Sequence, residues 1–495
     1  MLSLIVFLPL AAAAGVLGLP RGAAAAVRWV WVGVTAVDLA LGVALWLRYT
    51  TPGPNALAFE ERARWIPGVN SSYHIGVDGL SLPLVLMTAL IFVACALYGL
   101  RGDRPRSQAA LFLFLQSVSL GLFVAADLIL FFVFFDLSIV AMYFVIAGWG
   151  HGDAGRSALK FFLYTFLGSL ALLVGFIGLY IAASPHTFDM LELVAATPLA
   201  PRPLAGGLVL AAILVGLAVK TPTVPFHTWL PPAHTDAPAI GSAVLAGVLL
   251  KMGTYGFVRI AMPMLPQSWR AWSWIIIVVG IVSVLYGALV ALAQNDFKRM
   301  VAYTSINHMG YIVLAVGAAG LVSASTADAR AVAISGAVTQ MVSHGLITGA
   351  LFLLAGVFYD RTASYDMNAY GGLAAPAPKL AAVFAVGAFA SLGLPGLSGF
   401  IAEFQIFTGS IAATALSALA LPGILLTAAL FLRALQHVFT GDTRGLSQGF
   451  MDLRPSELGS AGMLLTLSVV IGILPRPLLD VIEPTSRTLV GLLGR

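Results

Sequence analysis

The fold is decided by residues 216–255, which read GLAVKTPTVPFHTWLPPAHTDAPAIGSAVLAGVLLKMGTY. Lys220 and Lys251 each stand inside a run that is otherwise hydrocarbon. A charge near the centre of a membrane helix costs about 2.5–3.5 kcal/mol, so it is retained only where another group compensates it. Pro222 and Pro225 remove backbone donors just after Lys220 and predict a broken helix, which a membrane tolerates only inside protein or beside water. The stretch therefore predicts an ion path.

The composition excludes a soluble protein. Of 495 residues 60% are hydrophobic and 9% are charged, and the mean hydropathy is +0.97, whereas a soluble domain carries about 25% charged residues. The apolar runs are about 20 residues long and do not alternate, which favours helices over a membrane β-barrel. The one cysteine, Cys95, lies in such a run, so we expect no disulfide, metal cluster or iron–sulfur centre. The fold class is an all-α polytopic membrane protein.

The apolar runs predict about fourteen transmembrane helices. The first is not a signal peptide, because it lacks a basic start and is long enough to span. The connection 49–77 is the one long loop. The predicted helices are residues 2–19, 27–48, 78–100, 108–126, 127–149, 157–184, 204–230, 239–261, 271–295, 299–320, 329–359, 379–411, 415–439 and 457–480.

An even number of spans places both termini on one side. Cytoplasmic loops are enriched in Lys and Arg, and here the side opposite the termini carries more of them, which predicts that both termini lie outside. That side carries Arg21, Arg28, Arg101, Arg104, Arg106, Arg156, Lys160, Lys298, Arg299, Arg361, Lys379, Arg444 and Arg454. The terminal side carries Arg48, Arg62, Arg64, Arg202, Arg259, Arg270, Arg330, Arg476, Arg487 and Arg495.

A second broken helix is predicted at residues 391–403, SLGLPGLSGFIAE. It stands five spans after the first, so the two breaks meet the membrane from opposite directions, as in an inverted repeat of a transporter. We therefore expect two inverted five-helix repeats, each containing a broken helix. The predicted parts are 1–107 (helices 1–3), 108–261 (first repeat), 271–439 (second repeat) and 440–495 (helix 14).

Six ionisable residues fall inside the predicted helices: Asp136, Lys220, Lys251, His308, His344 and Glu403. Left unpaired, they would cost about 15–20 kcal/mol, more than the stability of about 5–15 kcal/mol of a typical protein. We expect them to be paired, bridged by water or titrating. For Asp136 and Lys220 an inert ion pair stays an alternative, and the histidines could simply bond to neighbouring helices.

Three further ionisable residues lie in or beside the predicted helices. His227 and His234 lie toward the loop end of the first broken helix and are candidates for proton uptake, or they only line an opening. Asp38 lies within the second predicted helix, and the sequence identifies no partner for it.

A lysine beside a carboxylate suits proton transfer. Gaining or losing a carboxylate neighbour changes a pKa by about 1–3 units, or about 1.4–4 kcal/mol. Moving one charge through 100 mV costs about 2.3 kcal/mol. The two energies are of the same size, so switching the neighbour can drive a proton against a membrane potential.

At these residues the chain resembles the antiporter-like membrane subunits of respiratory complex I (NADH:quinone oxidoreductase), and among them the M-type subunit. The segment 219–256 carries most of the likeness. It is supported by VDGLSLPL (77–84), KFFLYTFLGS (160–169), DFKRMVAYTSINHMGY (296–311), SHGLITGALFLLAGVFYDR (343–361) and LPGLSGFIAEF (394–404).

The resemblance implies fourteen helices, two inverted repeats and a hydrated polar axis at the membrane midplane. It makes Lys220 the central proton carrier, Lys251 the connecting lysine and Glu403 the terminal group. His308 and His344 become relay residues. The family usually has glutamate where this chain has Asp136, so a direct contact with Lys220 is in doubt and a bridging water is an alternative.

The resemblance also implies the setting. The chain would lie in a bacterial inner membrane beside L-type and N-type neighbours and lipids, with no nucleic-acid partner. It would hold no cofactor, and flavin, iron–sulfur clusters and quinone would belong to partner subunits. Three rival interpretations stay open: a subunit of a multi-subunit cation/proton antiporter, an inert structural spacer and a solute transporter.

Overall fold

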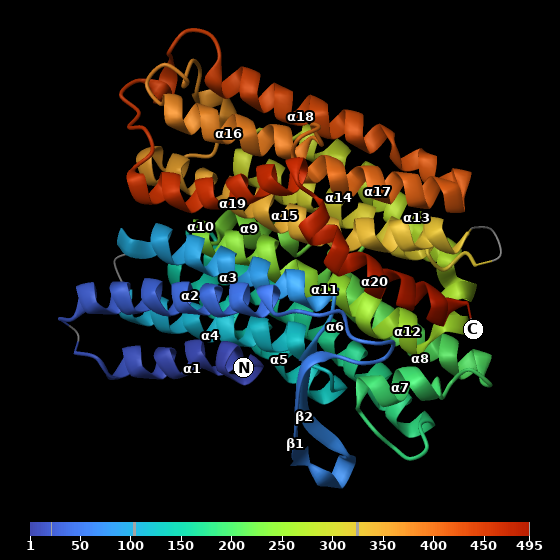
Figure 1. The fold of residues 1–495 in the computed structure, drawn as a ribbon. Helices are drawn as coiled ribbons and strands as arrows, with labels where there is room; N and C mark the ends of the chain where they lie inside the picture. The colour runs from blue at the N-terminus through green and yellow to red at the C-terminus, as the bar shows by residue number, and fades with distance from the viewer. Residues whose placement is uncertain (21, 102–104, 323–325, 495) are drawn as a thin grey trace.

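The protein is described here by a computed structural model that covers residues 1–20, 22–101, 105–322 and 326–494. Three arginines counted for topology, Arg21, Arg104 and Arg495, lie outside the described residues. Figure 1 shows long helices stacked side by side into one bundle. Within the described residues, eleven helices are long and apolar enough to cross a membrane. The predicted class, a helical polytopic membrane protein, is therefore confirmed.

The first half of the chain holds α1 (Leu2–Gly18), α2 (Ala24–Leu47), β1 (Ala58–Ile66), β2 (Ser71–Val77), α3 (Ser81–Tyr98), α4 (Pro105–Val124), α5 (Leu128–Trp149), α6 (Ala154–Ala182), α7 (Met190–Ala196), α8 (Pro203–Lys220) and α9 (Leu230–Asp236). The next helix is built from α10 (Ala239–Val244), the π-helical turn η3 (Leu245–Leu249), α11 (Leu250–Gly256), a second π-helical turn η4 (Phe257–Ala261) and α12 (Met262–Met264).

The second half holds α13 (Pro266–Leu292), α14 (Phe297–Ala318), α15 (Ala327–Thr362), α16 (Pro378–Ser391), α17 (Ser398–Ala413), α18 (Pro422–Phe439), α19 (Pro455–Ile473) and α20 (Arg476–Leu493). Short 3-10 turns are η1 (Pro67–Val69), η2 (Gly99–Arg101), η5 (Met367–Ala369), η6 (Ala415–Ala420) and η7 (Gly445–Ser447).

Both predicted helix breaks are present, between α8 and α9 and between α16 and α17. The three predicted stretches beyond the eleven apolar helices hold α1, α14 and the pair α16–α17. The count of fourteen spans, the repeats and the four predicted parts stay predictions.

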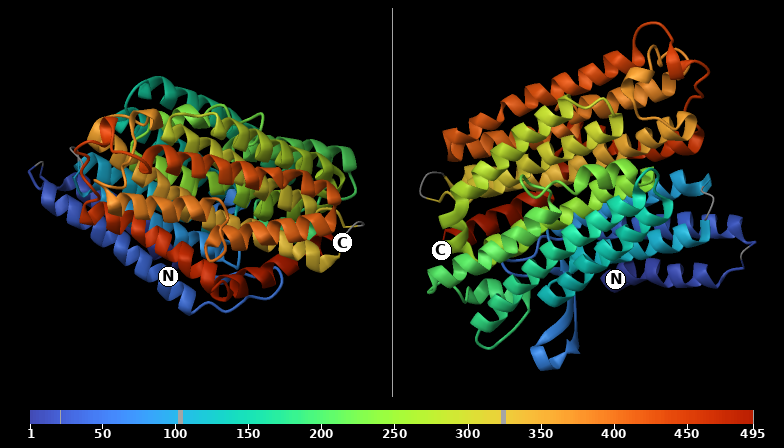
Figure 2. Two further views of the ribbon diagram at one scale, coloured as in Figure 1. Left: turned by 90° about the horizontal axis from the view of Figure 1, so that it is seen from above. Right: turned by 180° about the vertical axis from the view of Figure 1, so that it is seen from behind.

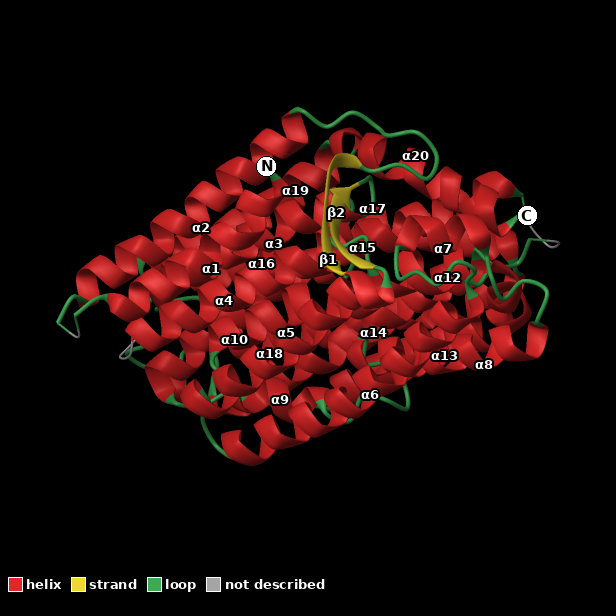
Figure 3. Ribbon diagram, turned by 90° about the horizontal axis from the view of Figure 1, so that it is seen from below, coloured by secondary structure: helices red, strands yellow, loops and turns green. Residues whose placement is uncertain are grey.

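The predicted loop 49–77 is wrong in one respect, because it contains the antiparallel hairpin β1–β2. Figures 1 and 3 show the hairpin projecting from the bundle. The inner strand β2 is buried against the helices, whereas β1 is largely exposed and polar. The two strands are nine and seven residues long, so neither can be recognised as a membrane span. Their sequences show the alternation typical of a strand only where the bundle covers one face of the hairpin.

The end of the chain also differs from the prediction. The predicted helix 457–480 ends at Ile473, and the separate helix α20 follows, so the chain does not stop after the fourteenth predicted helix. Pro475 and Pro477 explain the break, because neither has a backbone N–H for a continuing helix. The residues of α20 that face the bundle are apolar, including Leu478, Ile482 and Leu489.

Both termini lie at the end of the bundle that carries the hairpin, which we call the terminal side. The Met1 ammonium is 2.7 Å from Glu61 of β1, and the backbone N–H of Gly79 donates to Thr485 of α20. The views in Figure 2 agree with this placement. The predicted common side of the termini is thus observed within the bundle, while the compartment that it faces stays a prediction.

The core of the bundle is α15, which is buried along its apolar window. It packs against α3, α10, α14, α17 and α19. Because α15 is buried, its polar residues His344 and Gln340 lie next to several other helices at once.

Candidate functional site

Helix α8 ends at Lys220 because Pro222 cannot continue it. The protein supplies partners for the backbone groups that the break releases. The indole N–H of Trp229 donates to the Val219 carbonyl at 2.9 Å, and the N–H of Val224 donates to Ser283 of α13 at 3.0 Å. The broken backbone is therefore satisfied inside the bundle, as membrane depth requires.

Lys220 is almost completely buried, and its ammonium donates to the hydroxyl of Ser138 at 3.0 Å. It also lies 4.8 Å from the ring centre of Phe135. Asp136, on the same helix α5, is half-buried and interacts with Ser169 of α6. The contact of Lys220 is therefore with Ser138 rather than with Asp136, in keeping with the shorter reach of an aspartate.

The segment between the two lysines is tightly packed. A Cβ on Gly253 would collide with the hydroxyl of Thr221 and with the backbone of Leu217 and Thr221. Glycine at position 253 therefore lets the end of α8 approach α11, two residues from Lys251. The Thr221 hydroxyl lies buried at this junction between Lys220 and the helix of Lys251.

Lys251 is fully buried in α11, between the two π-helical turns. Its ammonium donates to the Ala246 carbonyl at 2.5 Å and lies 2.6 Å from Nδ1 of His344 on α15. A π-helical turn shifts the backbone hydrogen bonds by one residue, and such turns are frequent at functional sites. The lysine thus connects its helix to the central helix of the bundle.

The contacts continue from His344 to His308. We call the line of polar side chains from Asp136 to Glu403 the polar row. The two imidazole rings are 5.4 Å apart between their centres. His308 Nε2 lies 3.2 Å from the Ser391 hydroxyl, and His308 Nδ1 lies 3.1 Å from the Gln340 amide nitrogen. Nδ1 is also 3.8 Å from a carboxylate oxygen of Glu403. Lys251, His344, His308 and Glu403 therefore form one continuous cluster.

Glu403 is seated where α16 and α17 are interrupted. Its carboxylate lies over Gly393, where a Cβ would meet Oε2 at 2.7 Å, and Gly393 has φ +76°. Both the space and the dihedral angle require glycine. A cavity of about 10 Å³, bounded by His308, His344 and Glu403 among others, has room for one water molecule.

The far side of Glu403 borders a wider groove of about 630 Å³ on the outside of α17 and α18. Its walls are apolar and partly exposed, with Phe404 59% exposed. They are formed by Phe400, Phe404, Phe407, Ile411, Leu421 and Ile424. The polar row therefore runs from half-buried Asp136 at one end to a carboxyl group beside a lateral groove at the other.

The two remaining candidate histidines are buried: His227 lies in the turns between α8 and α9, and His234 lies in α9. His227 packs edge-on against Tyr286, and His234 stacks on Phe352 of α15 with ring centres 4.4 Å apart. His234 interacts electrostatically with Lys298 and Lys251. It therefore lies between these two lysines inside the bundle, instead of at an opening.

Lys298 gives this region a connection to the opposite side. It is buried, donates to the Ala237 carbonyl at 2.5 Å, and lies 3.3 Å from the hydroxyl of Tyr365. Tyr365 lines a cavity of about 440 Å³, together with His151 and Asp360. The Lys298 ammonium therefore lies next to a residue of this cavity, and His234 lies within electrostatic range of both Lys298 and Lys251.

Several buried polar atoms of the row have no hydrogen-bond partner among the residues that the structure describes. They are Asp136 Oδ1, Thr221 Oγ1, His227 Nδ1, both ring nitrogens of His234, Gln340 Oε1 and His344 Nε2. Buried polar atoms without protein partners are normally satisfied by ordered water. The expected hydration of these residues stays a prediction.

Sequence reasoning missed the uncharged members of the row and the role of Lys298. Ser138, Thr221, Gln340 and Ser391 carry no charge, so nothing in a hydropathy profile distinguishes them from packing residues. Asp38, whose partner could not be identified from the sequence, accepts a hydrogen bond from Gln116 of α4 at 2.7 Å.

No group of three or more His, Cys, Asp or Glu side chains within the described ranges is arranged to hold a metal ion. The prediction that this chain carries no metal or cofactor of its own stays a prediction.

Comparisons with known proteins agree on one family. A family model described as NADH:quinone oxidoreductase/Mrp antiporter, TM matches residues 125–430. The chain is 38% identical to NADH-quinone oxidoreductase subunit M of Rickettsia prowazekii, over 86% of this chain and 85% of the relative. It is 37% identical to subunit M of Rhodobacter capsulatus, over 99% and 96%.

Solved structures give the same result. A chain of respiratory complex I from Thermus thermophilus with bound NADH superposes with a TM-score of 0.89 at 31% identity, over 100% of both chains. A chain of the Mrp complex from Dietzia sp. superposes with a TM-score of 0.86 over 100% and 97%, and its 21% identity speaks for the fold alone.

Proposed function

Because the chain belongs to the family of antiporter-like membrane subunits, as an M-type subunit of NADH:quinone oxidoreductase, we propose that it moves protons along the row from Asp136 to Glu403. The single observation that carries the proposal is the contact of Lys251 with His344 at 2.6 Å. It joins the helix of Lys251 to the central helix α15, which carries His344. The row has no redox chemistry of its own, so the driving force comes from partner subunits.

In the proposed cycle a proton enters from the opposite side through the cavity at Tyr365. It passes Lys298 and His234 and reaches Lys251. His227 contributes a second approach, toward Lys220. The charge of Asp136 sets the proton affinity of Lys220 through its electric field, while Ser138 holds the ammonium in place by accepting a hydrogen bond from it.

Transfer through the second half uses the histidines. His344 takes a proton from Lys251, and His308 passes it toward Glu403, with one water in the small cavity as the link. Ser391 and Gln340 hold the His308 ring by its two nitrogens, which fixes its orientation. Changing the charge of Glu403 then alters the proton affinity of every group behind it.

The ends of the row suit contacts with other subunits. The groove beside Glu403 is apolar and partly exposed, and a carboxyl group at its floor can sense the charge of a neighbour. We assign this face to an L-type neighbour and the face near Asp136 to an N-type neighbour. In a bacterial inner membrane the terminal side then faces outward.

The experiment that tests this function replaces Lys220 by Ala and measures NADH-driven proton pumping by the assembled enzyme in vesicles. Asp136→Asn and Glu403→Gln are measured beside it. We expect pumping to fall in all three, most strongly for Lys220→Ala. Full pumping by an assembled Lys220→Ala enzyme would contradict the function.

A second candidate is an inert spacer, which the missing contact between Lys220 and Asp136 favours. A spacer would tolerate all three substitutions, so the same experiment separates the two. A subunit of a cation/proton antiporter is distinguished by purification: association with subunits that oxidise NADH supports the proposed function.

A further inference from the structure

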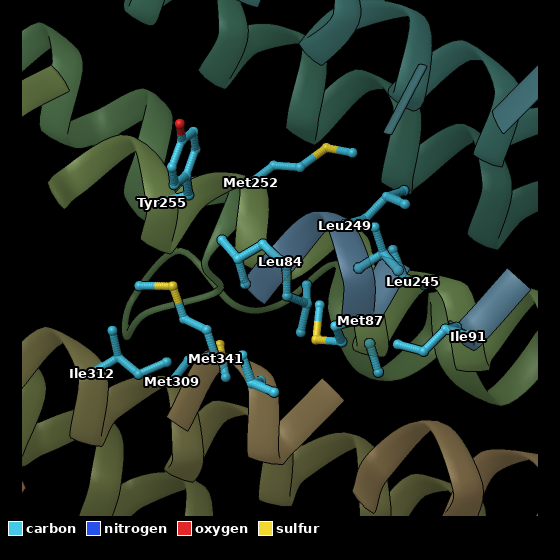
Figure 4. Close-up of a cluster of buried hydrophobic side chains, with 14 of the residues drawn as sticks. Leu84, Met87, Ile91, Leu245, Leu249, Met252, Tyr255, Met309, Ile312 and Met341 are labelled. Atoms are coloured by element: carbon cyan, nitrogen blue, oxygen red, sulfur yellow. The ribbon is translucent and has the colours of Figure 1, made fainter. Parts of the chain in front are cut away.

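A groove of about 720 Å³ follows the outside of α1, α4 and α5, and none of its described lining residues belongs to the polar row. Helix α1 packs against α4, and α4 packs against α5, at the edge of the bundle (Figure 1). In the core around α3 and α15, by contrast, buried side chains such as Met87, Leu245 and Met341 fill the space between the helices (Figure 4). An apolar groove in a membrane is filled by lipid or by another subunit, because an empty one forfeits packing contacts.

The groove has the shape and polarity of a binding site for an acyl chain. Its lining residues on α1 and α4 lie within residues 10–17 and 107–114, and each range extends about 10 Å along a helix axis. Ala13 and Ala110 are buried and have short side chains, so they form the floor of the groove, whereas Phe144 is 54% exposed at its margin. An acyl chain in a membrane runs in the same direction as these helices.

One end of the groove offers hydrogen-bond donors. Trp149 lines the groove, and its indole N–H is buried without a partner among the described residues. On α4, Arg106 stands one turn before the lining residue Ala110, so the two share one face of the helix. The Arg106 Nε–H is also buried and has no partner in the part of the chain that the structure describes. A buried N–H without a partner is destabilising, so an acceptor from outside this chain is expected at both atoms.

These donors lie where lipid headgroups are found. Arg106 is in the first turn of α4 and Trp149 is the last residue of α5, so both stand at the ends of apolar helices, on the side opposite the termini. Tryptophan is enriched at the interface between membrane and water. Guanidinium and N–H groups are good partners for a phosphate, and the positive charge favours a lipid with a negatively charged headgroup.

We propose that this groove binds one anionic phospholipid, with an acyl chain against α1, α4 and α5 and its phosphate bound to Arg106 and Trp149. The alternative occupant is an apolar helix of a neighbouring subunit, which supplies no anion for Arg106. The groove beside Glu403 is an internal contrast, because it has apolar walls but a carboxyl group where this groove has a guanidinium. Anionic lipid is therefore expected in the first groove and not in the second.

The phosphate also acts on proton uptake, and this consequence rests on the proposed function. Trp149 lines the cavity of Tyr365 as well as the groove, so the bound phosphate stands beside the proposed proton entrance. A fixed negative charge raises the local concentration of cations, including protons. Anionic lipid in the groove therefore speeds proton uptake.

The binding site is tested by photolabelling of the assembled enzyme in phosphatidylcholine vesicles. The probe is a phosphatidylglycerol with a diazirine in one acyl chain, and the labelled residues are located by mass spectrometry. We expect label on the lining residues Phe114 and Phe144, suppressed by excess phosphatidylglycerol but not by excess phosphatidylcholine. Arg106→Gln should lower this labelling by about fivefold, the effect of one arginine near an anionic lipid. The matched control is Arg156→Gln in the first turn of α6, which does not line the groove and should leave the labelling unchanged.

Three results would overturn the lipid site. Equal suppression by both lipids would show that the groove takes any acyl chain, and unchanged labelling of Arg106→Gln would show that the guanidinium does not bind the headgroup. A groove without label would belong to a neighbouring subunit. The proposed function is judged separately, because Lys220→Ala should abolish pumping without changing the labelling.

A second pair of variants tests the effect on proton uptake. Gly148 lines the groove, and a Cβ there would meet no described atom within 4 Å, so Gly148→Leu fills the groove without moving the backbone. A Cβ on Gly15 of α1 is equally free, but Gly15 does not line the groove, so Gly15→Leu is the matched control. We expect added phosphatidylglycerol to raise NADH-driven pumping by about twofold in the unchanged protein and in Gly15→Leu, and not in Gly148→Leu. The same increase in Gly148→Leu would overturn the effect on uptake, whereas the photolabelling decides the binding site itself.

Discussion

The two halves of the polar row are built differently. In the first half, the Lys220 ammonium contacts Ser138 and not the carboxylate of Asp136, which is half-buried and interacts with Ser169. In the second half, Lys251, His344, His308 and Glu403 follow one another at contact distances and are all buried. A small shift of one side chain can therefore change the electrostatic surroundings of Lys220 in the first half. In the second half, a change of charge at one group acts directly on the next group in the row.

The largest effect is expected where the halves meet. Lys251→Met removes the ammonium that contacts His344 and leaves a side chain of similar length. Since one proton-transferring group contributes about 10²–10⁴-fold to a rate, we expect NADH-driven pumping through this chain to fall by about 100-fold or more. The exposed Lys379 provides the control, because Lys379→Met should leave pumping unchanged. Equal pumping by both variants would mean that the halves are not joined at Lys251.

The next largest effect is expected for Asp136, in the first half of the row. Asp136→Asn removes the charge but keeps the shape, and a carboxylate neighbour changes proton affinity by about 10-fold to 1000-fold. We therefore expect pumping to fall by about tenfold. Asp136→Glu restores the charge with one more methylene and should pump at least as well as the unchanged protein. A loss with Asp136→Glu as large as with Asp136→Asn would show that position, not charge, matters.

Smaller losses of pumping, of different size in the two halves, are expected when a serine of each half is replaced. Ser138→Ala removes the hydroxyl that Lys220 contacts, and a hydrogen bond to a charged group contributes about 1.5–3 kcal/mol. Ser391→Ala removes only one of the groups around His308, which keeps Gln340 and Glu403. We expect a severalfold loss of pumping for Ser138→Ala and less than twofold for Ser391→Ala. The reverse order would contradict the comparison.

The smallest effect concerns the hairpin, which lies outside the row. Buried His74 of β2 is 2.7 Å from Asp189 and 2.9 Å from Glu60, and Arg62 is 3.3 Å from Asp189. Burial alone would lower the pKa of His74, but the bond to Asp189 and the nearby carboxylates raise it above 6.5. Burial alone would raise the pKa of Asp189, but the hydrogen bond with His74 and the nearby positive charges lower it below its ordinary value.

The raised pKa of His74 determines how the stability of the hairpin changes with pH. A raised histidine pKa stabilises the folded hairpin fully below the ordinary pKa of about 6.5, and the contribution is lost as the pH rises through the raised value. We expect the amide protection of β2 in hydrogen exchange to fall above neutral pH, by about 1–3 kcal/mol in opening free energy. In His74→Gln this pH dependence should be absent. A dependence that survives in His74→Gln would have to come from another group.

Much of the fold followed from the sequence because membrane helices are long and apolar. The breaks followed from Pro222 and from Gly393 and Pro395, whose backbone chemistry leaves little choice. The hairpin and α20 did not, because β2 is marked as a strand only by the bundle that covers it, and α20 is amphipathic rather than apolar.

The charged site residues were predictable for a similar reason: a lysine such as Lys251 in hydrocarbon needs a partner. Which partner it has was not predictable. The contact of Lys220 with Ser138 rather than Asp136, and the positions of Thr221 and Gln340, depend on how the helices pack. Neutral polar residues are frequent in membrane helices, so residue type alone does not identify the ones that belong to the site.

Proton transfer along the row requires water, which a map of the assembled enzyme at a resolution that shows water would reveal. We expect one water between His308, His344 and Glu403, and further waters that join Asp136 Oδ1 to Ser138 and Thr221 Oγ1 to Lys251 in an unbroken chain. A dry gap at either place, with these side chains in the positions described here, would contradict it.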